Sequence, residues 1–350
     1  MKPLIRIGTR GSKLALFQAN ALEIKLKERF PKLEFRVVRI QTRGDRFQRG
    51  AVGSSAGWAL DRTVPLDRAA VGRLEQRYRT VGSVPRDRRG AIGSIGTNVF
   101  TREIEDALLR GEVNVAVHSA KDLASELPAG LRIGAFLERD DRRDCLVARD
   151  GACFASLQKG ARIGTSSIRR QAQLRAMRSD LQFVPLRGNV DTRIEKVKRG
   201  ECEGMVLAFA GLKRLGLESS VTEIFEPDVL LPQAGQGAIA VQIRADDSHI
   251  APIVETINHD TTYQGVMSER AFLRGLQGGC QVPVGVTSTI RGGQLTLHGA
   301  IFALEGEQKV MGTETGPVLD FDEIGSRLAH RLFISGGERI LKTIQGITNA

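Results

Sequence analysis

Arginines and small polar residues recur in this sequence where apolar runs give way to helical patterns. The segments 9–12, 165–170 and 187–193 each combine Ser, Thr or Asn with one or two arginines. Ser, Thr and Asn cap helix N-termini, where free N–H groups and the helix dipole attract anions. Arginine adds a planar fork that binds a carboxylate or phosphate through two hydrogen bonds. One such junction can be a capped helix with a solvated arginine, but three together predict a ligand with several negative groups.

A fourth junction, His118 to Asp122, adds a carboxylate to this cationic set. We expect neighbouring cations to keep Asp122 ionised and to lower its pKa. Such a group can stabilise a cationic substrate or relay a proton on a nitrogen. The alternative is that Asp122 only pairs with Lys121 or a nearby arginine. His118, at a strand end, is more typical of a packed or hydrogen-bonded side chain than of a catalyst.

Cys280 lies between two glycines and a proline, in the segment Gly278-Gly279-Cys280-Gln281-Val282-Pro283. A cysteine on a tight loop can reach into a cleft, which suits a nucleophile. The local sequence offers no histidine partner, and most cysteines are small buried apolar residues. The local pattern therefore leaves both roles open.

The elements that would position these residues alternate between short strands and helices. Strands separated by helices of this length predict parallel sheets in an α/β fold, and ligands bind such sheets at the carboxyl ends of the strands. The predicted strands are 4–8, 35–40, 113–117, 162–164, 183–186 and 205–208, and the predicted helices are 12–30, 102–110, 167–178 and 190–198. From Val284 short strands with glycine turns precede one long helix, from about Asp322 to Ile344, which indicates a smaller α+β domain.

The net charge of +11 is unevenly distributed. Residues 46–92 contain ten arginines and four acidic residues, which is more than half of the excess charge. Aromatic residues make up only 5% of the chain, too few for base-stacking platforms, so a nucleic-acid partner is not expected. With no apolar run of membrane-spanning length and no signal-peptide pattern, we expect a cytoplasmic protein without a membrane partner. The four cysteines form no CxxC pair, which argues against a metal site.

Seven blocks of this sequence, in order and across nearly the whole chain, resemble the porphobilinogen deaminase (hydroxymethylbilane synthase) family. Any one block would be suggestive, but seven in order make the match specific. They are residues 9–16, 117–122, 164–171, 186–190, 210–216, 235–238 and 278–283.

The resemblance implies an α/β fold with two hinged domains like type II periplasmic binding proteins and a small α+β C-terminal domain. The first domain would comprise residues 1–137 with about 238–255, the second 143–231, and the third about 260–350. It also implies a transferase that joins four porphobilinogen units, with loss of ammonia, on a dipyrromethane cofactor. The product, hydroxymethylbilane, would pass to uroporphyrinogen III synthase. The enzyme would act in haem biosynthesis and would be a monomer.

The resemblance also implies roles for individual residues. Asp122 would be the catalytic carboxylate, and Cys280 would hold the cofactor through a thioether. The acetate and propionate groups of substrate and cofactor would be bound by Arg10, Ser12, Ser119, Lys121, Thr165, Ser166, Ser167, Arg169, Arg170, Arg187, Gly188, Arg193 and Arg214.

The basic segment 46–92 departs from the family pattern. Family members usually have about ten residues between the turn that corresponds to residues 43–45 and a Gly-rich segment with a lysine, and residues 93–100 lack that lysine. The segment can be a solvated loop, a basic lid that attracts the polyanionic substrate, or a docking surface. A solute-binding protein is the main rival function for the whole chain, but it would need neither Asp122 nor Cys280.

Overall fold

The computed structural model describes residues 4–42, 100–276 and 282–348. Its first sheet has the strand order β2-β1-β3-β10-β4, and β10 runs antiparallel to both of its neighbours. Helix α1 and the short turn η1 follow the ends of β1 and β3, and helix α4 precedes β3. The bounds are β1 (Leu4–Arg10), α1 (Lys13–Arg29), β2 (Glu34–Ile40), α4 (Arg102–Leu109), β3 (Val115–Ser119), η1 (Ala120–Asp122), β4 (Leu131–Phe136), β10 (Ile239–Arg244) and α8 (Ala251–Glu255).

The second sheet has the strand order β7-β6-β8-β5-β9, in which β5 runs antiparallel to β8 and β9. Its bounds are β5 (Asp144–Ala148), η2 (Arg149–Gly151), η3 (Phe154–Ser156), β6 (Arg162–Gly164), α5 (Ile168–Met177), β7 (Gln182–Val184), α6 (Val190–Lys198), β8 (Gly204–Ala208), α7 (Phe209–Lys213), η4 (Glu218–Ser220) and β9 (Glu223–Phe225).

The two sheets share one topology. Each sheet begins with three parallel strands of its own domain, in the order β2-β1-β3 in the first sheet and β7-β6-β8 in the second. The next strand in each sheet, β10 or β5, is antiparallel, and the chain enters it from the other domain. The segments 137–143 and 231–238 therefore cross between the domains. This confirms the predicted fold class, two domains like type II periplasmic binding proteins. The prediction of purely parallel sheets is wrong, because β5 and β10 reach their sheets through these crossings rather than through a helix.

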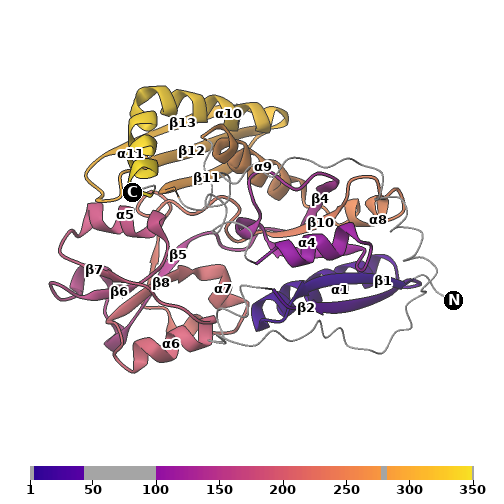
Figure 1. Ribbon diagram of the computed structural model, residues 1–350, viewed down its shortest axis with the longest axis horizontal. Helices are drawn as coiled ribbons and strands as arrows, with labels where there is room; N and C mark the ends of the chain where they lie inside the picture. The colour runs from indigo at the N-terminus through magenta and orange to yellow at the C-terminus, as the bar shows by residue number, and fades with distance from the viewer. Residues whose placement is uncertain (1–3, 43–99, 277–281, 349–350) are drawn as a thin grey trace, which may run out of the picture.

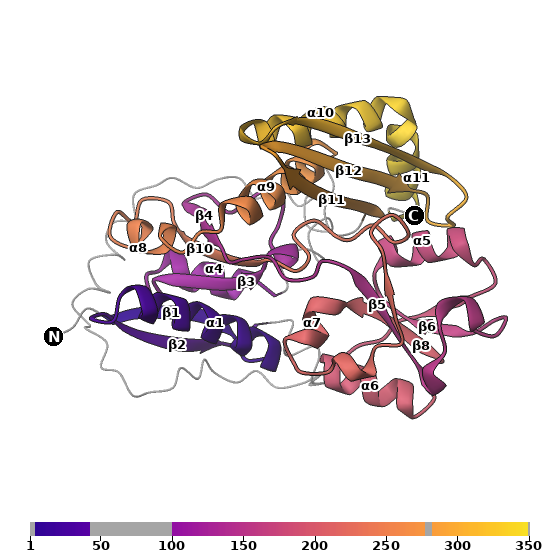
Figure 2. The same ribbon diagram turned by 180° about the vertical axis from the view of Figure 1, so that it is seen from behind.

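The third sheet is a separate antiparallel meander, β11-β12-β13, packed against helices. Figures 1 and 2 show it lying across the ends of the other two domains. The bounds are α9 (Asp260–Gly275), β11 (Val284–Arg291), β12 (Gln294–Phe302), β13 (Lys309–Pro317), η5 (Val318–Asp320), α10 (Phe321–Leu332), η6 (Phe333–Gly337) and α11 (Glu338–Thr348).

The single C-terminal helix predicted from the sequence is wrong. It is interrupted at Phe333–Gly337, where Gly336 has φ 118°, a conformation open to glycine but strained for other residues. The interruption lets two short amphipathic helices bury separate apolar faces. Ile324 and Leu328 of α10 and Leu341 of α11 belong to the same buried core as the third sheet.

Each domain has its own apolar core. Ile7, Val117 and Val241 from adjacent strands of the first sheet pack in one core, and Leu146, Ile163 and Val206 occupy the same role in the second. Helices cover both faces of these two sheets, so side chains on both sides of each inner strand are buried. This is why the inner strands are rich in β-branched residues and leucine. Among the described residues, no helix has the length and apolar character needed to cross a membrane.

Candidate active site

The junctions that the sequence singled out in the first domain gather around one pocket. The ends of β1 and β3 are neighbours in the sheet, so Arg10 and Ser119 face the same opening, and Asp122 follows on η1. The pocket is lined by Arg10, Ser12, Leu14, Ala15, Gln18, Phe100, Thr101, Val117, His118, Ser119 and Asp122. The carboxyl edge of this sheet therefore brings a carboxylate, a cation and several hydroxyl groups together.

Asp122 is half-buried in the wall of the pocket, and the loss of hydration raises the pKa of its carboxyl group. Lys121 and Arg10 act in the opposite direction but do not outweigh burial. The prediction of a lowered pKa is therefore wrong, because loss of hydration costs more than these cations return. Among the described residues, none donates a hydrogen bond to Asp122, so its carboxylate is not committed to a structural pair. The simple alternative of a local ion pair with Lys121 is not what the structure has.

Lys121 lies beside Asp122, and its Nζ donates a hydrogen bond of 3.3 Å to Oε1 of Gln236. Burial and the nearby Arg170 lower the pKa of Lys121 to about 8, although Asp122 and Asp144 favour its charged form. Gln236 belongs to the crossing segment that leads into β10. The amine of Lys121 is thus held between the first domain and the crossing segment 231–238.

Two further groups shape the pocket around Arg10. The Arg10 guanidinium lies 4.1 Å from the centre of the Phe100 ring, a cation–π contact. Gln18 is 2% exposed, and its Nε2 donates a hydrogen bond of 2.8 Å to Oγ of Ser119. Sequence reasoning missed Phe100 and Gln18. The signal for Gln18 was an amide on the face of α1 that carries the buried Ala15 and Leu22.

The capping prediction is confirmed at two junctions but not at the third, where Asn189 at the N-cap of α6 makes no side-chain capping hydrogen bond. Oγ of Ser12 accepts from the Ala15 amide at the start of α1, and Oγ of Ser167 accepts from the Arg170 amide at the start of α5. The buried Thr165 holds this second turn, because its Oγ1 accepts a hydrogen bond of 3.2 Å from the Ser167 amide. Ser166 between them is exposed.

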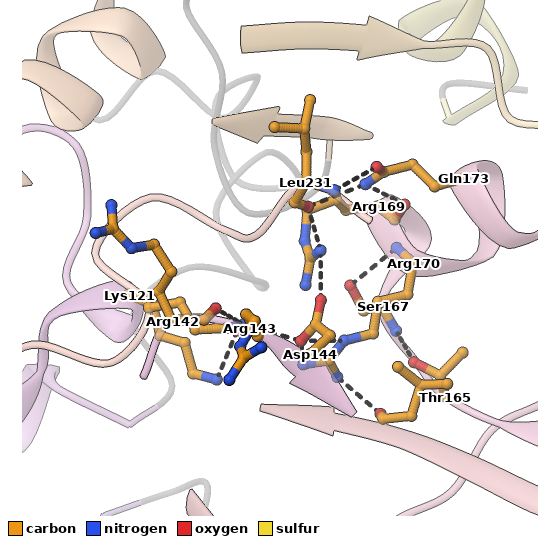
Figure 3. A network of polar contacts seen from close by, with 12 residues as sticks. Lys121, Arg142, Arg143, Asp144, Thr165, Ser167, Arg169, Arg170, Gln173 and Leu231 are labelled. Atoms are coloured by element: carbon orange, nitrogen blue, oxygen red, sulfur yellow. Dashed lines mark hydrogen bonds and ion pairs between the residues drawn. The ribbon is translucent and has the colours of Figure 1, made fainter. Parts of the chain in front are cut away.

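Arg169 and Arg170 project from α5 towards Asp144, at the start of β5 (Figure 3). Nη1 of Arg169 lies 2.7 Å from Oδ2 of Asp144, and Arg170 reaches Oδ1 through Nε at 3.1 Å and Nη2 at 2.7 Å. Gln236 adds a fourth donor at 2.9 Å. Burial alone would raise the pKa of Asp144, but the two arginines outweigh it and hold the pKa well below its usual range.

This cluster leaves one arginine only partly satisfied. Arg169 is 4% exposed, and its Nε and Nη2 have no hydrogen-bond partner within the described part of the chain. A buried guanidinium with unused donors is costly unless an anion completes it. Arg169 thus keeps two donors unused, while Arg170 is largely occupied by Asp144 and by the carbonyl of Val206.

The remaining predicted cations are spread along the second domain and the hinge. Arg187 is exposed, and the half-buried Arg193 donates from Nε to the carbonyl of Gly188 at 2.8 Å. Gly188 has φ 120°, which lets this carbonyl turn towards Arg193. Arg214 donates to the carbonyl of Gly237 at 2.5 Å, beside the hinge. These residues lie on a different domain from Asp122, so one ligand would have to span both.

Three predicted features lie outside the described residues: Cys280, the loop around it and the basic segment 46–92. The described cysteines Cys145, Cys153 and Cys202 are free thiols. Cys145 and Cys202 are buried and Cys153 is exposed.

The comparisons with known proteins agree over nearly the whole chain. Residues 5–60 and 76–252 match the family profile described as porphobilinogen deaminase, dipyromethane cofactor binding domain, and residues 263–333 match the porphobilinogen deaminase C-terminal domain. The profile leaves 61–75 unmatched, within the basic segment. Curated porphobilinogen deaminases of Pelobacter propionicus and Carboxydothermus hydrogenoformans are 42% and 38% identical. The alignments cover 97% and 100% of this chain, and 97% and 100% of those proteins, respectively.

Among solved structures, a putative methionine-binding lipoprotein of Bacillus subtilis has a TM-score of 0.39 at 11% identity, over 73% of this chain and 90% of its own. That likeness is too distant to bear on function.

The fold has two α/β domains joined by crossing segments and a third C-terminal domain, and the family matches make the protein a transferase. The chain belongs to the porphobilinogen deaminase family. It is a hydroxymethylbilane synthase, which polymerises porphobilinogen with loss of ammonia in tetrapyrrole biosynthesis, and its cofactor is dipyrromethane.

Proposed function

We propose that Asp122 is the catalytic carboxylate of this reaction. Positive charge develops on the pyrrole when the aminomethyl group leaves as ammonia, and a carboxylate close to that charge lowers the barrier. The observation that supports this role is that the Asp122 carboxylate has lost hydration without gaining a hydrogen-bond donor from the described chain. Asp122 is half-buried in the pocket wall, its pKa is raised, and within the described chain no donor is bound to it. It is therefore free to pair with a cationic group of the substrate.

The cations would divide the carboxylates of the growing chain between the two domains. Each porphobilinogen unit brings an acetate and a propionate, so separate binding positions are needed along the cleft. Arg10, Ser12, Ser119 and Lys121 would serve the units near Asp122. On the second domain, Arg169 offers unused donors. The residues proposed to complete that side are Thr165, Ser166, Ser167, Arg170, Arg187, Gly188, Arg193 and Arg214.

The covalent anchor in this proposal is Cys280. Dipyrromethane supplies the primer on which the chain grows, and a thioether to the loop cysteine would retain it through each turnover. The intact mass of the purified protein tests this. We expect a stable adduct of two pyrrole units in the wild type that is lost in Cys280→Ser.

The matched control is Cys153→Ser, since Cys153 is an exposed thiol far along the chain from the loop. It should keep the adduct and the activity. A bare chain mass in active wild-type protein, or an adduct that survives Cys280→Ser, would defeat the assignment of the anchor.

The proposal extends to the organisation of the whole protein. The crossing segments support a first domain of residues 1–137 with about 238–255, a second of 143–231 and a third of about 260–350. We propose that the enzyme works as a cytoplasmic monomer and passes hydroxymethylbilane to uroporphyrinogen III synthase. Light scattering of the purified protein tests the monomer.

A further inference from the structure

A chain of buried polar groups runs behind the pocket of Asp122. Glu105 of α4, Gln242 of β10 and His118 of β3 are 3%, 0% and 4% exposed. Nε2 of Gln242 lies 3.1 Å from Oε1 of Glu105, and Oε1 of Gln242 lies 3.0 Å from Nε2 of His118. His118 also lines the pocket. Three side chains from three elements therefore connect a buried carboxylate to the wall of the site.

The direction of these hydrogen bonds follows from the chemistry of the groups. An ionised carboxylate only accepts hydrogen bonds, so the amide of Gln242 must turn its NH2 group towards Glu105. Its carbonyl oxygen then faces His118 and can only accept. The imidazole must therefore carry its hydrogen on Nε2, and Nδ1 keeps a lone pair. Thr101 fixes the other end, since its Oγ1 donates to Oε2 of Glu105 at 3.3 Å.

The ring that results is neutral. Burial lowers the pKa of His118 to about 4, Gln242 acts against this, and Arg10 adds to the lowering. At neutral pH His118 thus offers an acceptor without adding a second positive charge near Asp122. That suits a reaction in which positive charge forms on the substrate.

We propose that Glu105 and Gln242 are positioning residues that hold His118 in the tautomer protonated on Nε2, so that Nδ1 presents a hydrogen-bond acceptor to the N–H groups of porphobilinogen. The opposite tautomer would present an N–H group to the same donors and repel them. This inference rests on the proposed site around Asp122. The tautomer itself can be measured without any turnover, so the two proposals can fail separately.

The charged groups around the relay determine how it responds to pH. Arg270 of α9 favours ionised Glu105, and Asp106 on the same helix opposes it. Burial is the largest effect and raises the pKa of Glu105. Once Glu105 is protonated it can donate as well as accept, so both orientations of the Gln242 amide become allowed. His118 should then populate both tautomers as the pH falls.

The test is to read the tautomer of His118 from the 15N chemical shifts of its ring in 15N-histidine-labelled protein. The signal is assigned by its loss in His118→Gln, since the chain has five histidines. We expect a single tautomer with hydrogen on Nε2 in the wild type. In Glu105→Gln the amide at 105 can donate or accept, so we expect a mixture of tautomers and a kcat about tenfold lower.

The matched control is Asp106→Asn, which removes one negative charge from the same helix without contacting Gln242. It should keep one tautomer and the wild-type kcat. A single Nε2-protonated tautomer in Glu105→Gln would overturn the proposal, and so would a mixture with unchanged kcat.

The exchange of the two partners gives a rescue. In the double variant Glu105→Gln with Gln242→Glu, the carboxylate faces His118 and again can only accept from Nε2. We expect the single tautomer to return with most of the lost kcat. Protonation of His118 removes the Nδ1 acceptor, so kcat should fall at acid pH. In the double variant this fall should begin at higher pH, because a carboxylate beside the ring raises the pKa of His118.

Gln242→Leu covers the case in which Glu105→Gln does not fold. Nε2 of His118 then loses its acceptor, so we expect both tautomers and a lower kcat. A single Nε2-protonated tautomer in this variant would contradict the role of Gln242.

Discussion

Two carboxylates of this protein, the fully buried Asp144 and the half-buried Asp122, differ in their hydrogen bonds, and we propose opposite uses for them. Asp144 accepts hydrogen bonds from Arg169, Arg170 and Gln236, and its pKa is held far below the ordinary value. Asp122 is half-buried, but within the described chain it accepts from no donor, and the loss of hydration raises its pKa. Burial acts on both in the same direction, so the difference comes from the donors alone. A carboxylate with its donors supplied by the fold stabilises the protein, whereas one left without them is available to a substrate.

The largest expected effect is on catalysis, from Asp122→Asn. The change keeps the shape of the side chain and removes the charge that we propose pairs with the substrate. We expect kcat to fall by roughly a hundredfold to ten-thousandfold, measured as ammonia release from porphobilinogen. Near-normal ammonia release in this variant would remove the distinction between the two carboxylates.

The matching change, Asp144→Asn, should act on stability instead. It leaves two buried guanidinium groups without their counter-charge, a loss worth about 3–5 kcal/mol of unfolding free energy. Urea unfolding at neutral pH measures it, with Asp122→Asn as the control of identical chemistry. If the two variants lose equal stability, the division between a structural and a reactive carboxylate is wrong.

The pH dependence of stability should differ in sign between the two sites. The folded pKa of Asp144 lies below its ordinary value of 3.8, so its contribution is full above that value and is lost as the pH falls towards the folded pKa. The folded pKa of Asp122 lies above 3.8, so its ionisation lowers the stability of the folded protein as the pH rises through that range. Asp122→Asn should therefore be at least as stable as the wild type at pH 7.

Unfolding curves of the two variants between pH 3 and pH 7 measure this contrast. The deficit of Asp144→Asn should shrink as the pH falls, while any gain of Asp122→Asn should shrink as well. A deficit of Asp144→Asn that is constant over this range would show that its cause is packing rather than charge.

The smallest expected effect concerns the ion pair that joins the two domains at the surface. Nζ of Lys13 lies 2.5 Å from Oδ2 of Asp191, with the lysine 78% exposed. Because solvent screens such a pair, Lys13→Met should change the unfolding free energy by less than about 1 kcal/mol. Its salt dependence at 0.1 M and 1 M NaCl checks the screening, and a loss as large as that of Asp144→Asn would contradict it.

Local sequence determined much of the site. Ser12 and Ser167 were predicted as caps because hydroxyl residues before a helical pattern satisfy the free N–H groups of its first turn. The strand ends were predicted because short runs rich in apolar residues stop at them. These features depend on neighbours in the chain, so a single sequence carries them.

The long-range pairs could not be predicted in the same way. Arg169 and Asp144 are 25 residues apart, and Gln236 reaches Asp144 across 92. Nothing in the local pattern distinguishes an arginine that binds a ligand from one that neutralises a buried acid. The raised pKa of Asp122 was missed for a related reason, since burial depends on the packing of several elements.

The position of β10 also has a consequence for the order in which the protein is made. This strand lies between β3 and β4 in the first sheet, yet it follows the whole second domain in the chain. During translation the first sheet therefore lacks an inner strand while residues 144–225 leave the ribosome. These residues contain every strand of the second sheet. The second domain can complete its fold first, and the N-terminal domain closes only when β10 emerges. A nascent chain that stops before residue 239 should contain a folded second domain and an unfinished first one.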